Sequence, residues 1–327
     1  MRKLRKYVVR KAFKDYLPER NDFEIVDEVI PALNDGEFLV KAEYISVDPY
    51  MRSFADGRDV PYDQFGFQVG KVVDSRNSHY PADIHVVSHS GWRDFSVLTA
   101  EPDPMFNVTP YRPHTGSLPI SLAIGALGMP GITAYLGLTE ICDPKENETV
   151  CVTSAGGAVG SLVGQIAKLK GCTVIGFAGS DHKVNMLLNE LGFDYAFNYK
   201  TTNVKEALNS TGNIDCYFDN VGGELAKIIL GNMKEHGRVA ICGSISTYGK
   251  KSRRKALKAP VSVKMEAFSF TQWDITKQQA AVSQLRDWLE SGAIKAKETI
   301  TNGFEELPDT LLAMLKGENV GKAVVKV

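Results

Sequence analysis

A glycine-rich turn constrains the fold of this chain more than any other part of its sequence. An apolar run at 149–153, expected to be a strand, ends in small residues, since residues 150–160 read Val-Cys-Val-Thr-Ser-Ala-Gly-Gly-Ala-Val-Gly. Apolar residues then recur at the spacing of one helical face from Val159 to Ala167. A second apolar run follows at 173–178. Strand, helix and strand in this order predict a βαβ unit, and therefore parallel strands in one sheet.

The spacing inside this turn is typical of the dinucleotide-binding fingerprint. Its three glycine places hold Ala155, Gly157 and Gly160. The first permits a tight turn, the second lets the backbone approach a pyrophosphate, and the third lets helix and strand pack closely. A pyrophosphate would lie on the backbone amides at the start of the helix. A glycine-rich turn without a ligand is the competing interpretation, and the complete βαβ frame favours the dinucleotide.

The end of the second strand predicts which dinucleotide is bound. NAD-selective sites place a carboxylate there for the ribose 2′-hydroxyl, whereas this chain has Gly179 and Ser180, with Lys183 one turn later. Space and positive charge at this place favour the 2′-phosphate of NADP. Lys183 has two other interpretations: a solvated lysine in a first helical turn, or the S-x-x-K motif of penicillin-recognising enzymes. The second is disfavoured, because residues 252–255 repeat that spacing and the companion motifs are missing.

The pattern along the chain predicts two domains, which suits a length of 327 residues. Up to about residue 120, short β-like runs alternate with Pro, Gly, Asp and Asn clusters. From Ser121, beginning with the helix-like run 121–127, helices alternate with buried strands; besides the two already named, strands are expected at 214–218 and 238–242. An amphipathic helix over 276–290, a helix over 307–316 and a final strand over 322–327 complete the pattern.

Composition excludes several classes of protein. The chain has 43% hydrophobic and 24% charged residues with a formal net charge of −1, which argues against disordered and nucleic-acid-binding classes. It has neither an apolar run of about eighteen residues nor a signal-peptide pattern after its basic opening. The cysteines, five in number, are widely spaced, and the basic run Lys250 to Lys258 is typical of a solvated loop. We expect an unprocessed, cytoplasmic chain with reduced, mostly buried thiols and no membrane span.

Metal binding has little support in the sequence. His85 and His89 flank Val-Val on an expected strand, and four residues at about 3.3 Å each would separate them by about 13 Å. The remaining histidines form no H-E-x-x-H motif or His/Cys cluster. The sequence therefore predicts no metal site.

Several short motifs follow one another along the chain. They are the glycine-rich turn, Ser46-Val-Asp-Pro-Tyr-Met-Arg52, 128–135 (Gly-Met-Pro-Gly-Ile-Thr-Ala-Tyr), 164–171 (Gly-Gln-Ile-Ala-Lys-Leu-Lys-Gly), 218–223 (Phe-Asp-Asn-Val-Gly-Gly), 241–248 (Ile-Cys-Gly-Ser-Ile-Ser-Thr-Tyr) and 315–322 (Leu-Lys-Gly-Glu-Asn-Val-Gly-Lys). With these motifs the chain resembles the prostaglandin reductase (leukotriene hydroxydehydrogenase) branch of the medium-chain dehydrogenases/reductases, essentially from end to end.

The resemblance implies an α/β architecture in which a Rossmann domain, a doubly wound parallel sheet, is inserted into a GroES-like β-barrel catalytic domain. On this basis we expect the catalytic domain at residues 1–122 plus 296–327 and the NADP-binding domain at 123–295. The resemblance also implies a homodimer. Zinc-dependent relatives carry a catalytic cysteine near Val47 and a four-cysteine lobe soon after, but this chain has no cysteine before Cys142. The chain is therefore expected to be zinc-independent.

The resemblance also assigns cofactor contacts. It places the pyrophosphate on Gly157, Ala158, Val159 and Gly160, and the 2′-phosphate on Lys183 and Tyr199. The other expected contacts are Asn220, Cys242, Gly243, Ser244, Ile245, Ser246, Thr247, Tyr248, Phe268, Ser269, Phe270 and Asn319. In one respect the chain departs from the branch. The tyrosine common a few residues before Met265-Glu-Ala-Phe268 is missing from 259–264, and the one often found after it is Thr271.

The activity implied is NADPH-dependent reduction of a carbon–carbon double bond conjugated to a carbonyl, with enones, enals and oxo-eicosanoids such as 15-oxo-prostaglandins as substrates. Hydride goes to the β-carbon. A zinc-free quinone reductase shares this fold and cofactor, and turnover alone separates the two. A non-catalytic relative that binds NADPH or RNA is a further alternative. The near-zero net charge and the lack of an aromatic-rich basic stripe argue against the nucleic-acid role.

Hydride addition leaves negative charge on the carbonyl oxygen, so a donor is needed within about 2.6–3.2 Å of it. With zinc and the usual tyrosine missing, the candidates are the nicotinamide ribose hydroxyl, Tyr50 and Tyr248. Arg52 is a candidate to attract the carboxylate of a fatty-acid substrate. The competing interpretations are a core aromatic for Tyr50, packing on the cofactor for Tyr248 and a surface ion pair for Arg52.

Overall fold

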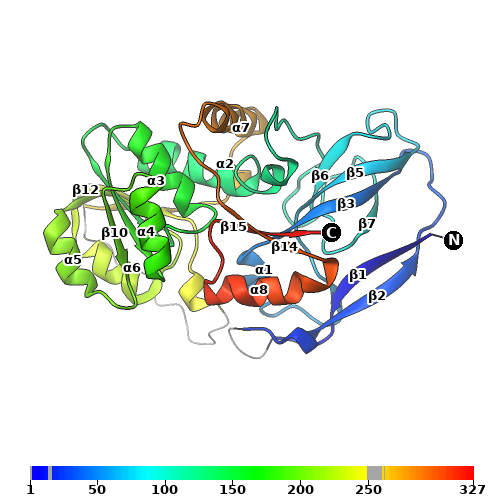
Figure 1. Cartoon of the computed structure of the whole chain (residues 1–327), viewed down its shortest axis with the longest axis horizontal. Coiled ribbons are helices and arrows are strands. Elements are labelled where there is room, and N and C mark those ends of the chain that lie inside the picture. The colour runs from blue at the N-terminus through cyan, green and yellow to red at the C-terminus, as the bar shows by residue number, and fades with distance from the viewer. Residues whose placement is uncertain (1, 14–16, 249–259, 261) are drawn as a thin grey trace. The chain divides into compact units, whose positions relative to one another are not determined.

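The computed structural model describes residues 2–13, 17–248, 260 and 262–327, so the basic run Lys250 to Lys258 lies outside the described residues. The chain divides into two compact units (Figure 1). The first comprises residues 1–125, 299–319 and 323–327, and the second comprises residues 126–298 and 320–322. The sequence analysis expects divisions after residue 122 and before residue 296, whereas the units divide after residue 125 and after residue 298, with residues 320–322 in the second unit.

The second unit is built on a parallel sheet, as expected. Within the described residues its strand order is β10-β9-β8-β11-β12-β13, and every neighbouring pair is parallel. This order is that of the doubly wound Rossmann fold, whose direction reverses between β8 and β11. The strands are β8 (Thr149–Thr153), β9 (Thr173–Ala178), β10 (Tyr195–Asn198), β11 (Ile214–Asp219), β12 (Met233–Ile241) and β13 (Lys264–Ala267).

Helices cover both faces of this sheet (Figure 1). On one face, α5 and α6 pack through Leu208 and Ile229 on a cluster that includes Phe177 and Tyr217. On the other face, α3 lies close to the sheet. Gly164 of α3 and Gly176 of β9 both leave room for the ring of Phe193. The helices are α2 (Met129–Leu136), the π-helix η3 (Gly137–Cys142), α3 (Gly160–Leu169), α4 (Asp181–Asn189), α5 (Val204–Thr211), α6 (Gly223–Leu230), η4 (Ile245–Thr247), η5 (Phe270–Gln272) and α7 (Ile275–Glu290).

The first unit consists of antiparallel strands. One sheet has the order β2-β1-β4, and another has the order β14-β15-β3-β5-β6 with β7 paired to β3. Because β15 pairs antiparallel with β3, both ends of the chain contribute to one sheet. The strands are β1 (Lys3–Val9), β2 (Phe23–Val29), β3 (Phe38–Val47), β4 (Tyr62–Asp63), β5 (Gln68–Ser75), β6 (His85–Ser88), β7 (Phe95–Leu98), β14 (Glu298–Asn302) and β15 (Lys322–Lys326).

Short helices complete the first unit: η1 (Arg20–Asp22), α1 (Tyr50–Ser53), η2 (Ile120–Ile124), η6 (Phe304–Glu306) and α8 (Leu307–Lys316). Its core contains the fully buried Trp92 and Phe304 together with Leu311 of α8. The expected helix-like run 121–127 is a short 3-10 helix that ends at Ile124 before Gly125. In the second unit, strand β12 begins at Met233 rather than Arg238, because exposed polar residues at 234–236 hide its start from the apolar pattern.

Candidate cofactor and active site

The glycine-rich turn joins β8 to α3 at the point where the sheet order reverses. A Cβ added to Gly160 would lie 2.4 Å from the Ser154 carbonyl oxygen, so only glycine lets the helix start against the turn. The Gly157 amide donates to the same carbonyl at 3.0 Å. Within the part of the chain that the structure describes, no side chain caps α3. The turn thus fits a pyrophosphate, because helix-terminal amides are available to bind an anion.

A cluster of positive charge lies beside this turn, at the ends of β9 and β10. Lys183, in the first turn of α4, is buried, and its stem fits against Gly156, where an added Cβ would come within 3.0 Å of Lys183 Cδ. Near Gly179, the Tyr199 hydroxyl and Lys200 Cε lie 3.2 and 3.4 Å from the place of an added Cβ.

The charges in this cluster repel each other. Burial, followed by the charge of Lys200, lowers the pKa of Lys183 from its usual value. A bound dianion would offset both effects, so the cluster fits a 2′-phosphate. The nearest carboxylate in sequence, Asp181, accepts a hydrogen bond from the Asn198 amide at 2.8 Å. Sequence reasoning missed Lys200, whose only signal is its place directly after Tyr199 at the end of the third strand.

Two loops beyond β11 and β12 are joined through Asp219, a fully buried residue that the sequence analysis did not single out. Its Oδ1 accepts hydrogen bonds from the Tyr217 hydroxyl at 2.8 Å and from the amides of Val221 and Gly222, both at 2.9 Å. Its backbone carbonyl accepts from the amides of Cys242 and Gly243 at 2.9 and 3.1 Å. The expected cofactor segments around 220 and 242–248 are therefore brought together at the carboxyl edge of the sheet.

Side chains within these loops are also held. The Asn220 amide nitrogen Nδ2 donates to the Thr153 carbonyl at 2.8 Å, which ties this loop to the end of β8. The Ser246 hydroxyl donates to the Val221 carbonyl at 2.7 Å. Burial raises the pKa of Cys242 to about 12, so its thiol stays protonated at neutral pH. An added Cβ at Gly243 would lie 3.5 Å from the Tyr248 hydroxyl, so this tyrosine folds back over its own loop.

The remaining expected cofactor contacts lie at the edge of the second unit and near the chain's end. Phe268 follows β13 and packs edge-on against Phe218, with ring centroids 5.9 Å apart. Ser269 is exposed and Phe270 is buried. Asn319 lies two residues before Gly321, whose amide donates to the carbonyl of Gly156 in the glycine-rich turn at 2.8 Å.

The three candidate catalytic residues are distributed over both units. Tyr50 begins α1 in the first unit, and its hydroxyl lies 3.3 Å from His89 Nε2. Arg52 in the same helix is only 1% exposed and pairs with Asp56 at 2.6 Å, so it is ion-paired but not at the surface. Tyr248 follows η4 in the second unit and is partly buried.

Within the described part of the chain, no group of three or more His, Cys, Asp or Glu residues could hold a metal ion. His85 instead bonds Glu43 at 3.1 Å, and His89 bonds Tyr50 and Asp103. The five cysteines are free thiols; four are buried and Cys242 is partly buried. The metal-independent chemistry stays a prediction, tested below.

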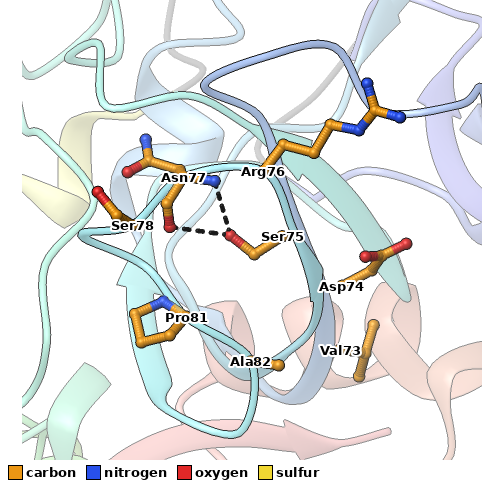
Figure 2. A pocket seen from close by; sticks show the side chains of 8 residues that line it. All are labelled: Val73, Asp74, Ser75, Arg76, Asn77, Ser78, Pro81 and Ala82. Carbon is orange, nitrogen blue, oxygen red and sulfur yellow. Dashed lines mark hydrogen bonds between the residues drawn. The ribbon is translucent and has the colours of Figure 1, made fainter.

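A shallow hollow on the first unit contains none of the expected site residues. Figure 2 shows its lining at the end of β5 and on the loop that follows. The hollow has a volume of about 410 Å³. The Ser75 hydroxyl there points to the Asn77 backbone and makes two hydrogen bonds with it at 3.0 Å. These bonds brace the loop itself, and we assign no ligand to the hollow.

Known proteins are similar to this chain over nearly its whole length. Residues 5–105 match a family described as the N-terminal domain of oxidoreductase, and residues 158–288 match one described as zinc-binding dehydrogenase. Prostaglandin reductase 1 of Oryctolagus cuniculus is 44% identical, covering 99% of this chain and 93% of that protein. The 2-alkenal reductase (NADP(+)-dependent) of Nicotiana tabacum is 35% identical, covering 98% and 97%.

A solved structure agrees with these relatives. CurA from Vibrio vulnificus in complex with NADPH superposes with a TM-score of 0.88 at 31% identity, covering 99% of each chain. A Rossmann unit placed between two stretches of one β unit is the architecture of the medium-chain dehydrogenases/reductases. This chain belongs to that family, in the branch of the prostaglandin reductases.

Proposed function

We propose that this chain is an NADPH-dependent reductase of the carbon–carbon double bond in α,β-unsaturated ketones and aldehydes. Relatives named as prostaglandin reductase and 2-alkenal reductase support this activity, and a similar structure is a complex with NADPH. The observation in this chain that carries the proposal is the cluster of Lys183, Tyr199 and Lys200 beside the glycine-rich turn. Enones, enals, 15-oxo-prostaglandins and related oxo-eicosanoids are the proposed substrates.

Each part of the second unit has a proposed task in holding the cofactor. The turn from Gly157 to Gly160 would bind the pyrophosphate through the amides of Ala158, Val159 and Gly160, since the Gly157 amide donates to the Ser154 carbonyl. The lysine cluster would bind the 2′-phosphate. The loops joined by Asp219 would line the remainder, together with Phe268 to Phe270. The family resemblance adds Asn319 as a proposed contact. When bound there, NADPH supplies the hydride that goes to the β-carbon.

The chain's own residues supply the proton and hold the developing charge. After hydride addition the carbonyl oxygen is negative and needs a hydrogen-bond donor. Tyr50 and Tyr248 are the proposed donors. Burial, and then the nearby charge of Asp48, raises the pKa of Tyr50 well above its usual value, so it is a phenol rather than a phenolate at neutral pH. Arg52 forms an ion pair with Asp56, and this pair weakens the proposal that Arg52 attracts the carboxylate of a fatty-acid substrate.

The proposal extends to organisation and location. We assign the first unit as the catalytic domain and the second as the NADP-binding domain, and we propose a cytoplasmic homodimer. The homodimer rests on family resemblance, and sedimentation velocity would measure it. Among the described helices, none is long and apolar enough to cross a membrane.

Steady-state oxidation of NADPH across a panel of enones, enals and quinones tests the activity. We expect rapid turnover with enones and enals, reduction of the double bond in the isolated product, and a clear preference for NADPH over NADH. Turnover confined to quinones would favour the quinone reductase instead. Equal affinity for NADH and NADPH would contradict the assigned phosphate cluster.

A further inference from the structure

A chain of three polar side chains crosses the first unit beside α1. The Tyr50 hydroxyl lies 3.3 Å from His89 Nε2, and His89 Nδ1 lies 3.1 Å from Asp103 Oδ1. The three residues come from a helix, from the end of β6 and from a loop before residue 110, so only the tertiary fold brings them together. The side chains of His89 and Asp103 are 3% and 11% exposed. The side chains of His89 and Asp103 are therefore largely shielded from solvent.

The loop around Asp103 holds its carboxylate in place. The amides of Met105 and Phe106 donate to Oδ1 at 3.0 and 2.9 Å, and the amide of Val108 donates to Oδ2 at 3.0 Å. Burial raises the pKa of Asp103, but the hydrogen bonds from His89 and these amides outweigh it and lower the pKa to about 2. Asp103 is therefore ionised at any working pH. It keeps a proton on His89 Nδ1 and turns Nε2 toward Tyr50.

Aromatic rings fix the middle of the chain. The His89 ring lies 4.7 Å from the ring of Phe67 and 4.9 Å from that of Phe106, measured between centroids. Tyr50 is packed by Phe65 and by the same Phe106. The imidazole therefore has one orientation, with one nitrogen on the carboxylate and the other on the phenol.

Loss of the Tyr50 proton would be costly without a replacement. A phenolate there would be largely removed from water and would face the negative charges of Asp48 and Asp103, and a hydrogen bond from the Phe67 backbone would offset only part of this cost. His89 Nε2 is the group placed to replace that proton. When His89 is neutral, Nε2 instead accepts the hydrogen bond of the Tyr50 hydroxyl and turns its proton away from any substrate.

We propose that Asp103 and His89 form a proton relay that supplies the Tyr50 hydroxyl, with protonated His89 as the active form. The inference rests on the proposed reductase function. The Tyr50 O–H bond breaks as its proton passes to the negative oxygen of the reduced substrate, and the electron pair stays on the phenolic oxygen. The Nε2–H bond of His89 then breaks as that proton moves to Tyr50. Neutral His89 then takes a proton from a hydronium ion of the solvent, which reaches the 3% of its side chain that is exposed, and Asp103 stays ionised throughout.

The roles differ along the relay. Tyr50 is the catalytic residue, whereas His89 and Asp103 are positioning residues that act through it. Because the active His89 is protonated, turnover should fall as alkaline pH removes its proton. A histidine that only fills space would give no such dependence on pH.

The test compares turnover with an enone, over about pH 5.5 to 9, for the wild type, Tyr50→Phe, His89→Gln and the double variant. Each single change should lower kcat by roughly 10²-fold or more, with NADPH affinity unchanged. The double variant should be no slower than Tyr50→Phe, because residues that act as one unit are not additive. The alkaline fall of the wild type should vanish in His89→Gln. The matched control is His85→Gln, at the other end of β6, which should keep wild-type kinetics.

Additive losses, or an alkaline fall that persists in His89→Gln, would overturn the relay. Asp103→Asn provides a second route if His89→Gln does not fold. Without the carboxylate, the alkaline fall should move to lower pH, and an unchanged profile would overturn the relay as well. A wild type that fails to reduce any enone would instead overturn the proposed function, so the two failures are distinct.

Discussion

At the scale of single residues, the cofactor cluster divides into what sequence can and cannot predict. Lys183 is predictable, because the missing carboxylate after β9 and a lysine one turn later are both visible in the chain. Lys200 is not, because it follows a short, partly exposed strand without a strong apolar pattern. His89 and Asp103 are likewise invisible, since their partnership with Tyr50 exists only in the folded first unit.

The lysine cluster leads to a prediction about cofactor choice. Lys183→Ala should weaken NADPH binding by about 10- to 150-fold, since a charged hydrogen bond contributes roughly 1.5–3 kcal/mol. NADH affinity should hardly change, because NADH has no 2′-phosphate. Fluorescence titration with both nucleotides would measure the two affinities.

Lys200→Ala should show the same selectivity with a smaller loss, since Lys200 is exposed whereas Lys183 is buried. Lys205→Ala, an exposed lysine in the first turn of α5, is the control and should bind both nucleotides normally. An equal loss of NADH and NADPH binding in Lys183→Ala would show that the change damages the fold rather than the phosphate contact.

At the scale of elements, sequence patterns perform best where burial is uniform. Strands β8 and β9 and helix α8 begin and end where the apolar runs predict. Strand β13 escapes prediction, because the segment Lys264–Ala267 alternates charged with apolar residues at the sheet's edge. The first residues of β12 and the short 3-10 helix η2 also differ from the predicted bounds, because contacts made in the folded chain determine where these elements begin and end.

An ion pair ties β12 to the start of β8. Arg238 Nη1 donates to Glu148 Oε1 at 3.0 Å, and its Nε donates to the carbonyl of Cys142 at 2.8 Å. The hydrogen bond from Arg238 holds the pKa of Glu148 below its usual value. A depressed pKa in the folded state stabilises the fold above the unfolded value of about 4.3 and ceases to do so as pH falls through the lower folded value.

This pair predicts how stability depends on pH. Glu148→Gln should reduce the free energy of unfolding by about 1–2 kcal/mol at pH 7, because the hydrogen bonds are charge-assisted and partly buried. The difference from the wild type should persist down to about pH 5 and shrink below about pH 4. Urea denaturation at several pH values would measure it. Glu224→Gln, in the exposed pair with Lys227 on α6, should have no measurable effect, and an equal loss in both variants would refute the assignment.

At the scale of the whole molecule, the chain's order determines its architecture. Residues 323–327 return to pair with β3 after the Rossmann unit is complete, so one β unit is built from both ends. The change from β-like runs to alternating strands and helices predicts two domains, and the family resemblance implies that one is inserted into the other. The family resemblance assigns Asn220 and the loop 242–248 to one cofactor, but the sequence does not show that Asp219 joins the two loops, because it does so through backbone and buried side-chain hydrogen bonds.

Metal independence concerns the whole chain, and it is the last prediction. A catalytic zinc needs three protein ligands and an open position. Each histidine on β6 or directly after it is bonded to another partner: His85 to Glu43, and His89 to Tyr50 and Asp103. Cys151 and Cys216 are buried thiols with a raised pKa. The main cause is burial for Cys151 and the hydrogen bond to Cys142 for Cys216, and a raised pKa disfavours the thiolate that zinc requires.

Exhaustive chelation should therefore leave enone reduction and the melting temperature unchanged, and elemental analysis should find no stoichiometric zinc. Loss of one zinc per chain together with activity, restored by adding zinc back, would show that this chain departs from the chemistry assigned to Tyr50 and its relay.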